Sequence, residues 1–209
     1  MLRYSVKPMG RPREHDERTA AALLAAAERM VQESGPDALS VRGVATEVGT
    51  TTRAVYSLFG SKERLLAALG AHAFDLLRDG LEALPLTDDP AADLVEAGLM
   101  FRRFASEHPS LFAIGVQRAT AASTPWPPIL DAAYAALDVL KARVGRLGEL
   151  GGRTIAQATL QFHALCEGLA ANELRGTMNV ADWELMWRQA LGALVAGFAA
   201  QPATPSHSA

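Results

Sequence analysis

Side chains that can read or hold a nucleic acid gather between residues 50 and 57. Thr52 and Arg53 are adjacent there, and Tyr56 and Ser57 follow one helical turn later. A guanidinium group pairs in bidentate fashion with a guanine edge, while hydroxyl and phenol groups reach phosphate oxygens or base edges. The alternative is structural, with Tyr56 packed in a core and the charges on an ordinary solvated surface. The first interpretation requires an element that presents these side chains together.

The surrounding sequence predicts two short helices joined by a tight turn. Helix starts and stops are supplied by the cap candidates Ser40, Thr51 or Thr52, and Ser61, and by the breaks at Gly35-Pro36, Gly49 and Gly60. They bound a first helix near 16–33, two short helices over about 41–48 and 52–59, and a long helix from residue 62. Apolar residues of the short helices have the spacing of a small shared core: Val44, Ala45, Val48, Val55 and Phe59. This arrangement predicts a helix-turn-helix at about residues 40–59.

A family resemblance rests on this segment. The run Leu39-Ser40-Val41-Arg42-Gly43-Val44-Ala45-Thr46-Glu47-Val48-Gly49, continued by Val55-Tyr56, Phe59 and Ser61-Lys62-Glu63 before Leu65-Leu66, resembles the TetR/AcrR family of bacterial transcriptional regulators. The match covers roughly residues 16–70, a third of the chain. Two positions depart from the pattern: Leu58 replaces a residue that is often polar, and Gly43 weakens the first short helix.

The resemblance implies that the second short helix is a DNA-recognition helix. The positions that it assigns to DNA contact are Arg42, Thr50, Thr51, Thr52, Arg53, Ala54, Tyr56, Ser57 and Lys62. Arg42 and Lys62 match phosphate contacts that flank the recognition helix. Lys62 also lies at a predicted helix N-terminus, where backbone amides favour an anion.

Charge is distributed as such an interface requires. The net charge is −3, but residues 1–65 hold ten Lys or Arg against eight Asp or Glu, and the remaining residues hold ten against fifteen. The basic excess therefore lies where phosphate would be met. Arg11 and Arg13 belong to a predicted flexible basic arm over residues 1–15, which either reaches DNA or is an ordinary solvated leader.

Other protein classes lack support in the sequence. A single cysteine, Cys166, excludes an internal disulfide framework, and neither a membrane-length apolar run nor a secretory signal is found. We therefore expect a cytoplasmic protein. No phosphate-binding loop, paired metal-binding histidines or nucleophile elbow is present, so we expect neither an enzyme nor a cofactor or metal site.

Helical periodicity continues through the rest of the chain and predicts an all-α fold. Helices are expected at about 62–84, 89–107, 109–116, 128–147, 153–175 and 181–200. The predicted organisation is a three-helix helix-turn-helix domain at 16–65, a larger helical ligand-binding and dimerisation domain at 66–200, and a disordered tail at 201–209. Two segments of the larger domain, 101–112 and 162–169, resemble one C-terminal subtype of the family more loosely.

Aromatic and polar side chains in this larger domain are candidates for a ligand cavity between helices. They are Phe101, Phe104, Phe112, Trp126, Phe162, His163 and Cys166. For each of them, plain core packing is the alternative. His163 and Cys166 are two metal-ligating types without a third or fourth ligand, so the structural interpretation prevails for that pair.

The last two predicted helices are apolar on more than one side, which indicates burial on both. The resemblance implies that such helices form a four-helix interface between two copies of the chain. Candidate interface residues are Ala156, Leu160, Ala164, Gly168, Trp187, Leu191, Leu194 and Phe198. A large monomeric core is the alternative.

Together these features predict a ligand-responsive regulator, acting as a repressor, that binds a palindromic operator as a homodimer. Its partners would be double-stranded operator DNA, a second copy of itself and a small, largely apolar effector, with no membrane. The alternatives are a ligand-independent DNA-binding regulator and a helical small-molecule-binding or enzymatic domain with a vestigial helix-turn-helix.

Overall fold

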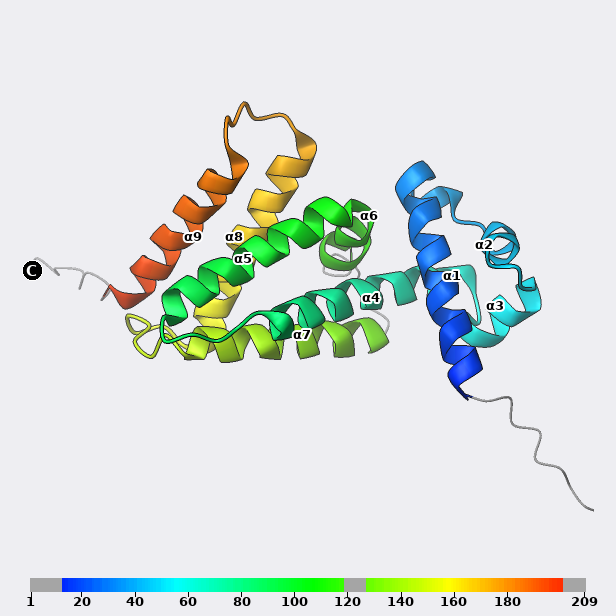
Figure 1. The fold of residues 1–209 in the computed structure, drawn as a ribbon, viewed down its shortest axis with the longest axis horizontal. Helices are drawn as coiled ribbons and strands as arrows, with labels where there is room; N and C mark the ends of the chain where they lie inside the picture. The colour runs from blue at the N-terminus through cyan, green and yellow to red at the C-terminus, as the bar shows by residue number, and fades with distance from the viewer. Residues whose placement is uncertain (1–12, 119–126, 201–209) are drawn as a thin grey trace, which may run out of the picture. The chain divides into compact units, whose positions relative to one another are not determined.

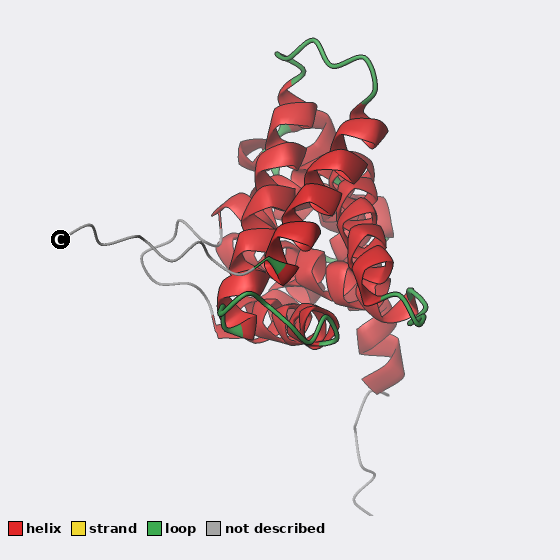
Figure 2. Ribbon diagram, turned by 90° about the vertical axis from the view of Figure 1, so that its left-hand side faces the viewer, coloured by secondary structure: helices red, strands yellow, loops and turns green. Residues whose placement is uncertain are grey.

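The computed structural model describes residues 13–118 and 127–200, and every regular element in these two ranges is a helix (Figures 1 and 2). The elements are α1 (Arg13–Ser34), the 3-10 turn η1 (Pro36–Ala38), α2 (Val41–Val48), α3 (Thr52–Phe59), α4 (Lys62–Ala83), α5 (Pro90–Glu107), α6 (Pro109–Leu111), the π-helix η2 (Phe112–Arg118), α7 (Pro127–Gly145), α8 (Ile155–Arg175) and α9 (Trp183–Ala199). The prediction of an all-α fold is confirmed. Arg11, Trp126 and the predicted tail lie outside the described residues. Helix α1 begins at Arg13, three residues before its predicted start.

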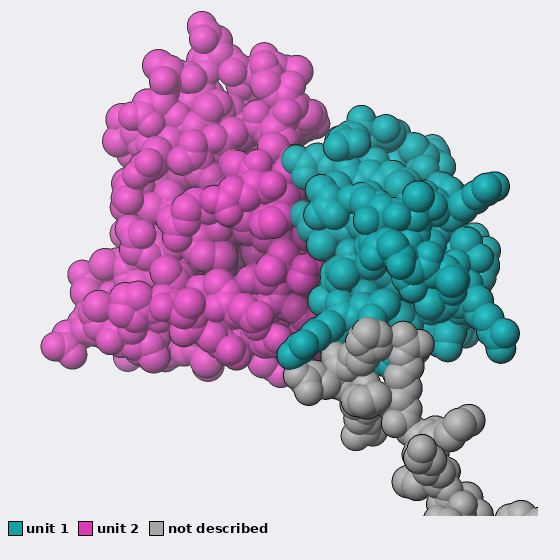
Figure 3. Space-filling view, turned by 45° about the vertical axis from the view of Figure 1, so that its right-hand side comes forward, with its two compact units in different colours: residues 1–69 teal, residues 70–209 magenta. Residues whose placement is uncertain are grey.

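The chain forms two compact units, residues 1–69 and 70–209, which are coloured separately in Figure 3. Helix α4 contributes residues 62–69 to the first unit and 70–83 to the second. Each unit has its own apolar core. That of the first unit includes Leu23, Ala26, Val44, Ala45, Val55, Leu65 and Leu69, all of which are buried.

Local capping explains why α2 and α3 are short and close together. Ser40 Oγ accepts a hydrogen bond from the Gly43 amide at 3.3 Å, and Thr51 Oγ1 accepts one from the Ala54 amide at 3.2 Å. Gly49 ends α2 with a φ of 72°, a left-handed conformation that costs glycine little. The turn therefore leaves only three residues between the last residue of α2 and the first residue of α3.

Helices α1 and α2 approach closely because residue 43 has no side chain. A methyl group at Gly43 would lie 2.7 Å from Met30 Cε, and Met30 Sδ also accepts a hydrogen bond from the Ser40 amide. An ion pair of 2.6 Å between Arg29 and Glu47 joins the same two helices at the surface. Glycine at residue 43 therefore lowers the helix propensity of α2, but it allows Met30 to pack closely against this helix.

In the second unit, α5 packs against α7, α8 and α9. The predicted helix over 109–116 is instead the short α6 followed by the π-helix η2. Gly115 of η2 lies so close to α4 that a methyl group there would be 2.6 Å from Ala73 Cβ and 3.0 Å from the Gly70 carbonyl oxygen. Helices α8 and α9 are connected by residues 176–182 and pack against each other.

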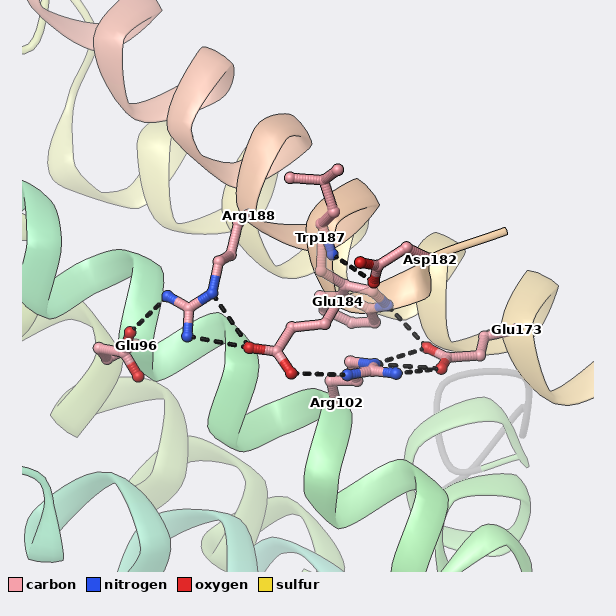
Figure 4. Close-up of polar contacts among 8 residues, drawn as sticks. Glu96, Arg102, Glu173, Asp182, Glu184, Trp187 and Arg188 are labelled. Atoms are coloured by element: carbon pink, nitrogen blue, oxygen red, sulfur yellow. Dashed lines mark hydrogen bonds and ion pairs between the residues drawn. The ribbon is translucent and has the colours of Figure 1, made fainter. Parts of the chain in front are cut away.

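A chain of ion pairs and hydrogen bonds joins α5, α8 and α9 (Figure 4). The Glu173 carboxylate accepts hydrogen bonds from the Arg102 guanidinium at 2.7 to 3.0 Å and from Trp187 Nε1 at 2.8 Å. Towards solvent, Arg188 donates to Glu184 at 3.1 Å and to Glu96 at 2.8 Å. Glu173 thus satisfies the indole of a fully buried tryptophan and links three helices.

Two arginines join the end of α7 to other elements: Arg143 contacts the C-terminal end of α4, and Arg146 contacts α5. Buried Arg143 donates hydrogen bonds to the backbone carbonyls of Leu81 and Leu84. Arg146 binds the Asp93 carboxylate, and this hydrogen bond, with further ones from Thr87, lowers the pKa of Asp93 to about 2. The Arg143 guanidinium therefore adds a side-chain donor to the Leu81 carbonyl, which also accepts a hydrogen bond from the Leu84 amide at 3.3 Å.

Candidate nucleic-acid interface and ligand cavity

Helix α3 presents one polar face to solvent. Thr52, Arg53, Tyr56 and Ser57 are all exposed, at positions that recur after one helical turn, whereas Val55 on the opposite side is 1% exposed. Tyr56 is 52% exposed, so the alternative in which its ring is part of the core is excluded. Of the other predicted contacts in this segment, Thr51 is exposed and Thr50 and Ala54 are half-buried.

The charged residues predicted to flank α3 differ in their surroundings. Arg42 on α2 is exposed, as is Arg53, and neither guanidinium group makes a hydrogen bond or ion pair with another residue in the described ranges. Lys62 instead donates a hydrogen bond from Nζ to the Asp37 carbonyl oxygen at 3.2 Å. Because an ammonium group has three donors, Lys62 can still contact a phosphate while it anchors η1 to α4.

A cavity of about 470 Å³ lies within the second unit, among α4, α5, α7 and α8. Four of the residues predicted to line a ligand cavity do so: Phe101, Phe162, His163 and Cys166. Two others are buried without lining this cavity, since Phe112 packs edge to face against Phe101 and Phe104 contacts both Phe101 and His108. The aromatic cluster around Phe101 therefore forms one wall of the cavity and the core behind that wall.

Most of the lining comes from residues that were not predicted. Helix α4 contributes Phe74, Leu77 and Leu81, α5 contributes Ala97 and Met100, and α7 contributes Ala133, Tyr134, Ala136, Leu137, Leu140 and Lys141. The spacing of Phe74, Leu77 and Leu81 places them on one face of α4, which is a signal present in the sequence. That spacing alone does not distinguish a cavity wall from a filled core.

The cavity is apolar, and its polar groups are uncharged except for one. Burial lowers the pKa of His163, an effect that the nearby Glu167 carboxylate only partly opposes, and burial raises the pKa of the Cys166 thiol. The Thr159 hydroxyl donates a hydrogen bond to the Ile155 carbonyl at 2.7 Å. The exception is Lys141 on α7, the one lining residue with a formally charged side chain.

The predicted interface residues separate into two groups. Ala156, Leu160, Ala164 and Gly168 are exposed along α8, and Leu194 is half-buried. Trp187, Leu191 and Phe198 are buried at 0%, 0% and 1% exposure within the second unit, so their side chains offer no surface to another chain. Their apolar character is explained by packing within the chain.

Large apolar side chains remain exposed on α8, α9 and the segment between them. They are Ile155, Leu160, Leu174, Met178, Leu185 and Met186, each at least 40% exposed. A methyl group at Gly168 or Gly197 would meet no atom within 4 Å, so packing within the chain does not require glycine at these positions in the helices.

Residues 13–118 and 127–200 contain neither a membrane-spanning helix nor a cluster of metal-ligating side chains. No helix there is long and apolar enough to span a membrane. Nor do three or more His, Cys, Asp or Glu side chains of these ranges come together as a metal site would require.

Comparison with known proteins identifies a family that matches the N-terminal segment and solved structures that share the fold. Residues 23–69 match the model of a family described as bacterial regulatory proteins, tetR family. No protein of curated function matches the chain significantly in sequence. A protein of unknown function from Rhodococcus sp. RHA1 is 23% identical with a TM-score of 0.76, over 86% of this chain and 94% of that one.

Two similar structures contain ligands. The transcriptional regulator FadR from Bacillus subtilis, in complex with stearoyl-CoA, has 16% identity and a TM-score of 0.69, over 85% of this chain and 98% of that one. A TetR variant from Acinetobacter baumannii AYE, in complex with minocycline, has 22% identity and a TM-score of 0.58, over 85% and 94%. At these low sequence identities, the similarity to the three structures shows a shared fold alone.

Proposed function

We propose, on the premise that residues 23–69 match the family of bacterial regulatory proteins, tetR family, that this chain is a ligand-responsive repressor that binds a palindromic operator as a homodimer. The exposed face of α3 is the observation that carries this proposal. A helix that turns Arg53, Tyr56 and two hydroxyls outward while Val55 fixes it to a core has the form of a recognition helix.

In this proposal the N-terminal part of the chain binds DNA, and the C-terminal part binds the effector and the second copy. Residues 16–65 contact DNA, with Arg53 at a guanine edge, Thr52 and Ser57 at phosphates or bases, and Arg42 and Lys62 at phosphates. Residues 66–200 bind the effector and the second copy. This division agrees with the polar face of α3 in the first compact unit and the cavity in the second.

The second copy would cover the outer face of α8, which we define as Ala156, Leu160, Ala164 and Gly168, together with the exposed apolar residues of α9. Burying exposed leucine and methionine side chains favours association, and small residues permit close approach of two helices. Two recognition helices about 34 Å apart would then enter successive major grooves.

The effector would occupy the cavity of about 470 Å³, a volume suited to a small, largely apolar molecule. The structures of FadR with stearoyl-CoA and of a TetR variant with minocycline show that this fold accommodates ligands of very different shape. The alternative is a regulator in which the cavity stays empty and DNA binding does not respond to a ligand.

Selection of bound fragments from genomic DNA tests the DNA-binding proposal. The wild-type protein should enrich a short palindrome, and an Arg53→Ala variant should enrich it less strongly, with a relaxed preference at one base pair in each half-site. Failure of the wild-type protein to retain any sequence above random DNA would refute the assignment and favour a small-molecule-binding domain.

The same operator then tests the effector proposal by linkage. A ligand that lowers operator affinity must itself bind more weakly, by the same factor, to operator-bound protein; typical couplings are about 5- to 150-fold. Equal ligand affinities with and without operator would leave a DNA-binding protein without that switch.

A further inference from the structure

The cavity has a buried end and an exposed rim. Phe101, Phe162 and Cys166 are 7%, 2% and 1% exposed, whereas Tyr134 on α7, which also lines the cavity, is 59% exposed. Leu160 on α8 lines the cavity as well, but it belongs to the outer face of α8 that the second copy would cover, so the open part of the rim lies on α7. Tyr134, Leu137 and Lys141 follow one another at the spacing of a single helix face, so α7 supplies one edge of the rim. A bound molecule would therefore place one end among aromatic rings and the other near solvent.

Positive charge at this rim comes from Lys141. Lys141 is the one formally charged side chain among the lining residues, and its side chain is 37% exposed. Gly145 at the end of α7 lies against Ile155 at the start of α8, so Lys141 and Ala156 line the same end of the cavity.

Two of the lining residues, Lys141 and His163, have carboxylate partners that lie outside the lining. The Asp138 carboxylate lies 2.9 Å from Lys141 Nζ and its side chain is 70% exposed, so it competes for Lys141 from the solvent side. Glu167 lies 3.7 Å from His163 Nε2, and no carboxylate belongs to the lining itself. A cationic ligand would meet Lys141 at the rim and find no partner for its charge inside.

We propose that the ligand of this cavity is an anionic amphipath, with its apolar part among Phe74, Phe101 and Phe162 and its carboxylate or comparable anionic group at Lys141. This inference rests on the proposed effector function and names the chemical class that the site selects. The charged group stays at the partly exposed rim, so its hydration is largely kept while the apolar part is buried.

Three molecules with the same ten-carbon chain test the proposal: decanoate, 1-decanol and decylammonium. Each would be titrated, below its aggregation concentration, against the protein loaded with the uncharged fluorescent probe N-phenyl-1-naphthylamine. An exposed ion pair is worth up to about 5-fold in affinity, and a like-charge contact costs a similar factor. We therefore expect decanoate to bind about 5- to 25-fold more tightly than decylammonium, with decanol between them, and the gap to shrink with added salt.

Variants assign this preference to Lys141. In Lys141→Gln the affinities of decanoate and decylammonium should converge, while Asp138→Asn, which frees Lys141, should widen the gap. Arg103→Gln is the matched control, since Arg103 is an exposed residue of α5 outside the lining and its loss changes the net charge equally.

The possible failures are distinct. A probe that does not bind the wild-type protein, or that none of the three molecules displaces, would overturn both the effector proposal and this inference. Probe displacement with equal affinities for decanoate and decylammonium, or a preference that survives Lys141→Gln, would overturn the anionic assignment and leave the cavity as a ligand site.

Discussion

Gly98 on α5 faces Leu191 on α9 so closely that a methyl group at residue 98 would lie 2.5 Å from Leu191 Cδ1 and 2.8 Å from Leu191 Cδ2. Leu191 is fully buried, so its side chain cannot swing away into solvent. The contact between these two helices therefore depends on the absence of a side chain at residue 98, and it fixes which face of α9 is turned inward.

Gly98→Ala should lower the free energy of unfolding by about 1–3 kcal/mol, because the added methyl group overpacks the interface between α5 and α9. Urea denaturation measures the change. Gly192→Ala on α9 is the control: a methyl group there meets no atom within 4 Å, and alanine is the better helix former. If Gly98→Ala cost the same in a Leu191→Ala background, the clash would not be its cause.

Arg53→Ala should lower operator affinity by about 1–3 kcal/mol and relax the preference at one base pair in each half-site. Lys62→Ala should weaken binding to all sequences alike and reduce the salt dependence, because it removes a phosphate contact. Binding assays on operators substituted at single positions compare the two. An equal loss on every operator from Arg53→Ala would show that Arg53 contacts phosphate.

Loss of Glu173 should be far more harmful than loss of Arg188 in the same network. Glu173→Ala leaves the buried Trp187 indole and the partly buried Arg102 without their acceptor, which we expect to cost about 2–4 kcal/mol of stability. Arg188→Ala removes exposed pairs and should cost less than about 1 kcal/mol. Similar unfolding curves for the two variants would contradict this distinction.

Acidification should destabilise the protein partly through His163. Its pKa lies below the ordinary value of 6.5 because of burial, so as the pH falls below that value the unfolded chain takes up a proton more readily than the folded one. His163→Gln should therefore reduce the loss of unfolding free energy between about pH 8 and pH 5. If the free energy of unfolding of His163→Gln depended on pH as that of the wild-type protein does, groups other than His163 would cause the loss of stability.

Gly168→Glu should disrupt the proposed dimer, because it puts a charge on the outer face of α8 where two copies would meet. Sedimentation should show a monomer or aggregates, whereas Ala91→Glu, an exposed change near the start of α5, should leave a dimer. An undisturbed dimer in Gly168→Glu would move the interface elsewhere. A wild-type monomer would remove the two-site operator model.

Local signals in the sequence predict the helix-turn-helix well. Ser40, Gly49 and Thr51 act through hydrogen bonds and backbone preferences within a few residues, so the bounds of α2 and α3 follow from the sequence. The structure also gives a reason for Gly43, which looked like a weakness of α2 when taken alone. Its partner Met30 lies on another helix, beyond the reach of local rules.

The larger unit shows where sequence periodicity is insufficient. Residues Trp187, Leu191 and Phe198 have the spacing of an apolar face, and that spacing alone does not show whether the face meets the chain's own core or another chain. The close contact between Gly98 and Leu191, and the burial of all three side chains, show that this face packs against the chain's own core. Likewise, Phe104 and Phe112 are aromatic residues at helical spacing, as Phe101 is. Only the packing in three dimensions shows that Phe101 lines the cavity and that the other two do not.

The polar face of α3 and the lining of the cavity use separate stretches of the chain, within residues 52–57 and 74–166. No residue belongs to both, so inherited changes in one set need not be compensated in the other. After a gene duplication, a few substitutions on α3 would direct the same chemical sensitivity to a new promoter. If the proposed function is correct, changes at Leu137 or Lys141 would equally let an existing promoter respond to a new molecule, so the two specificities are separate targets for evolution and for biosensor engineering.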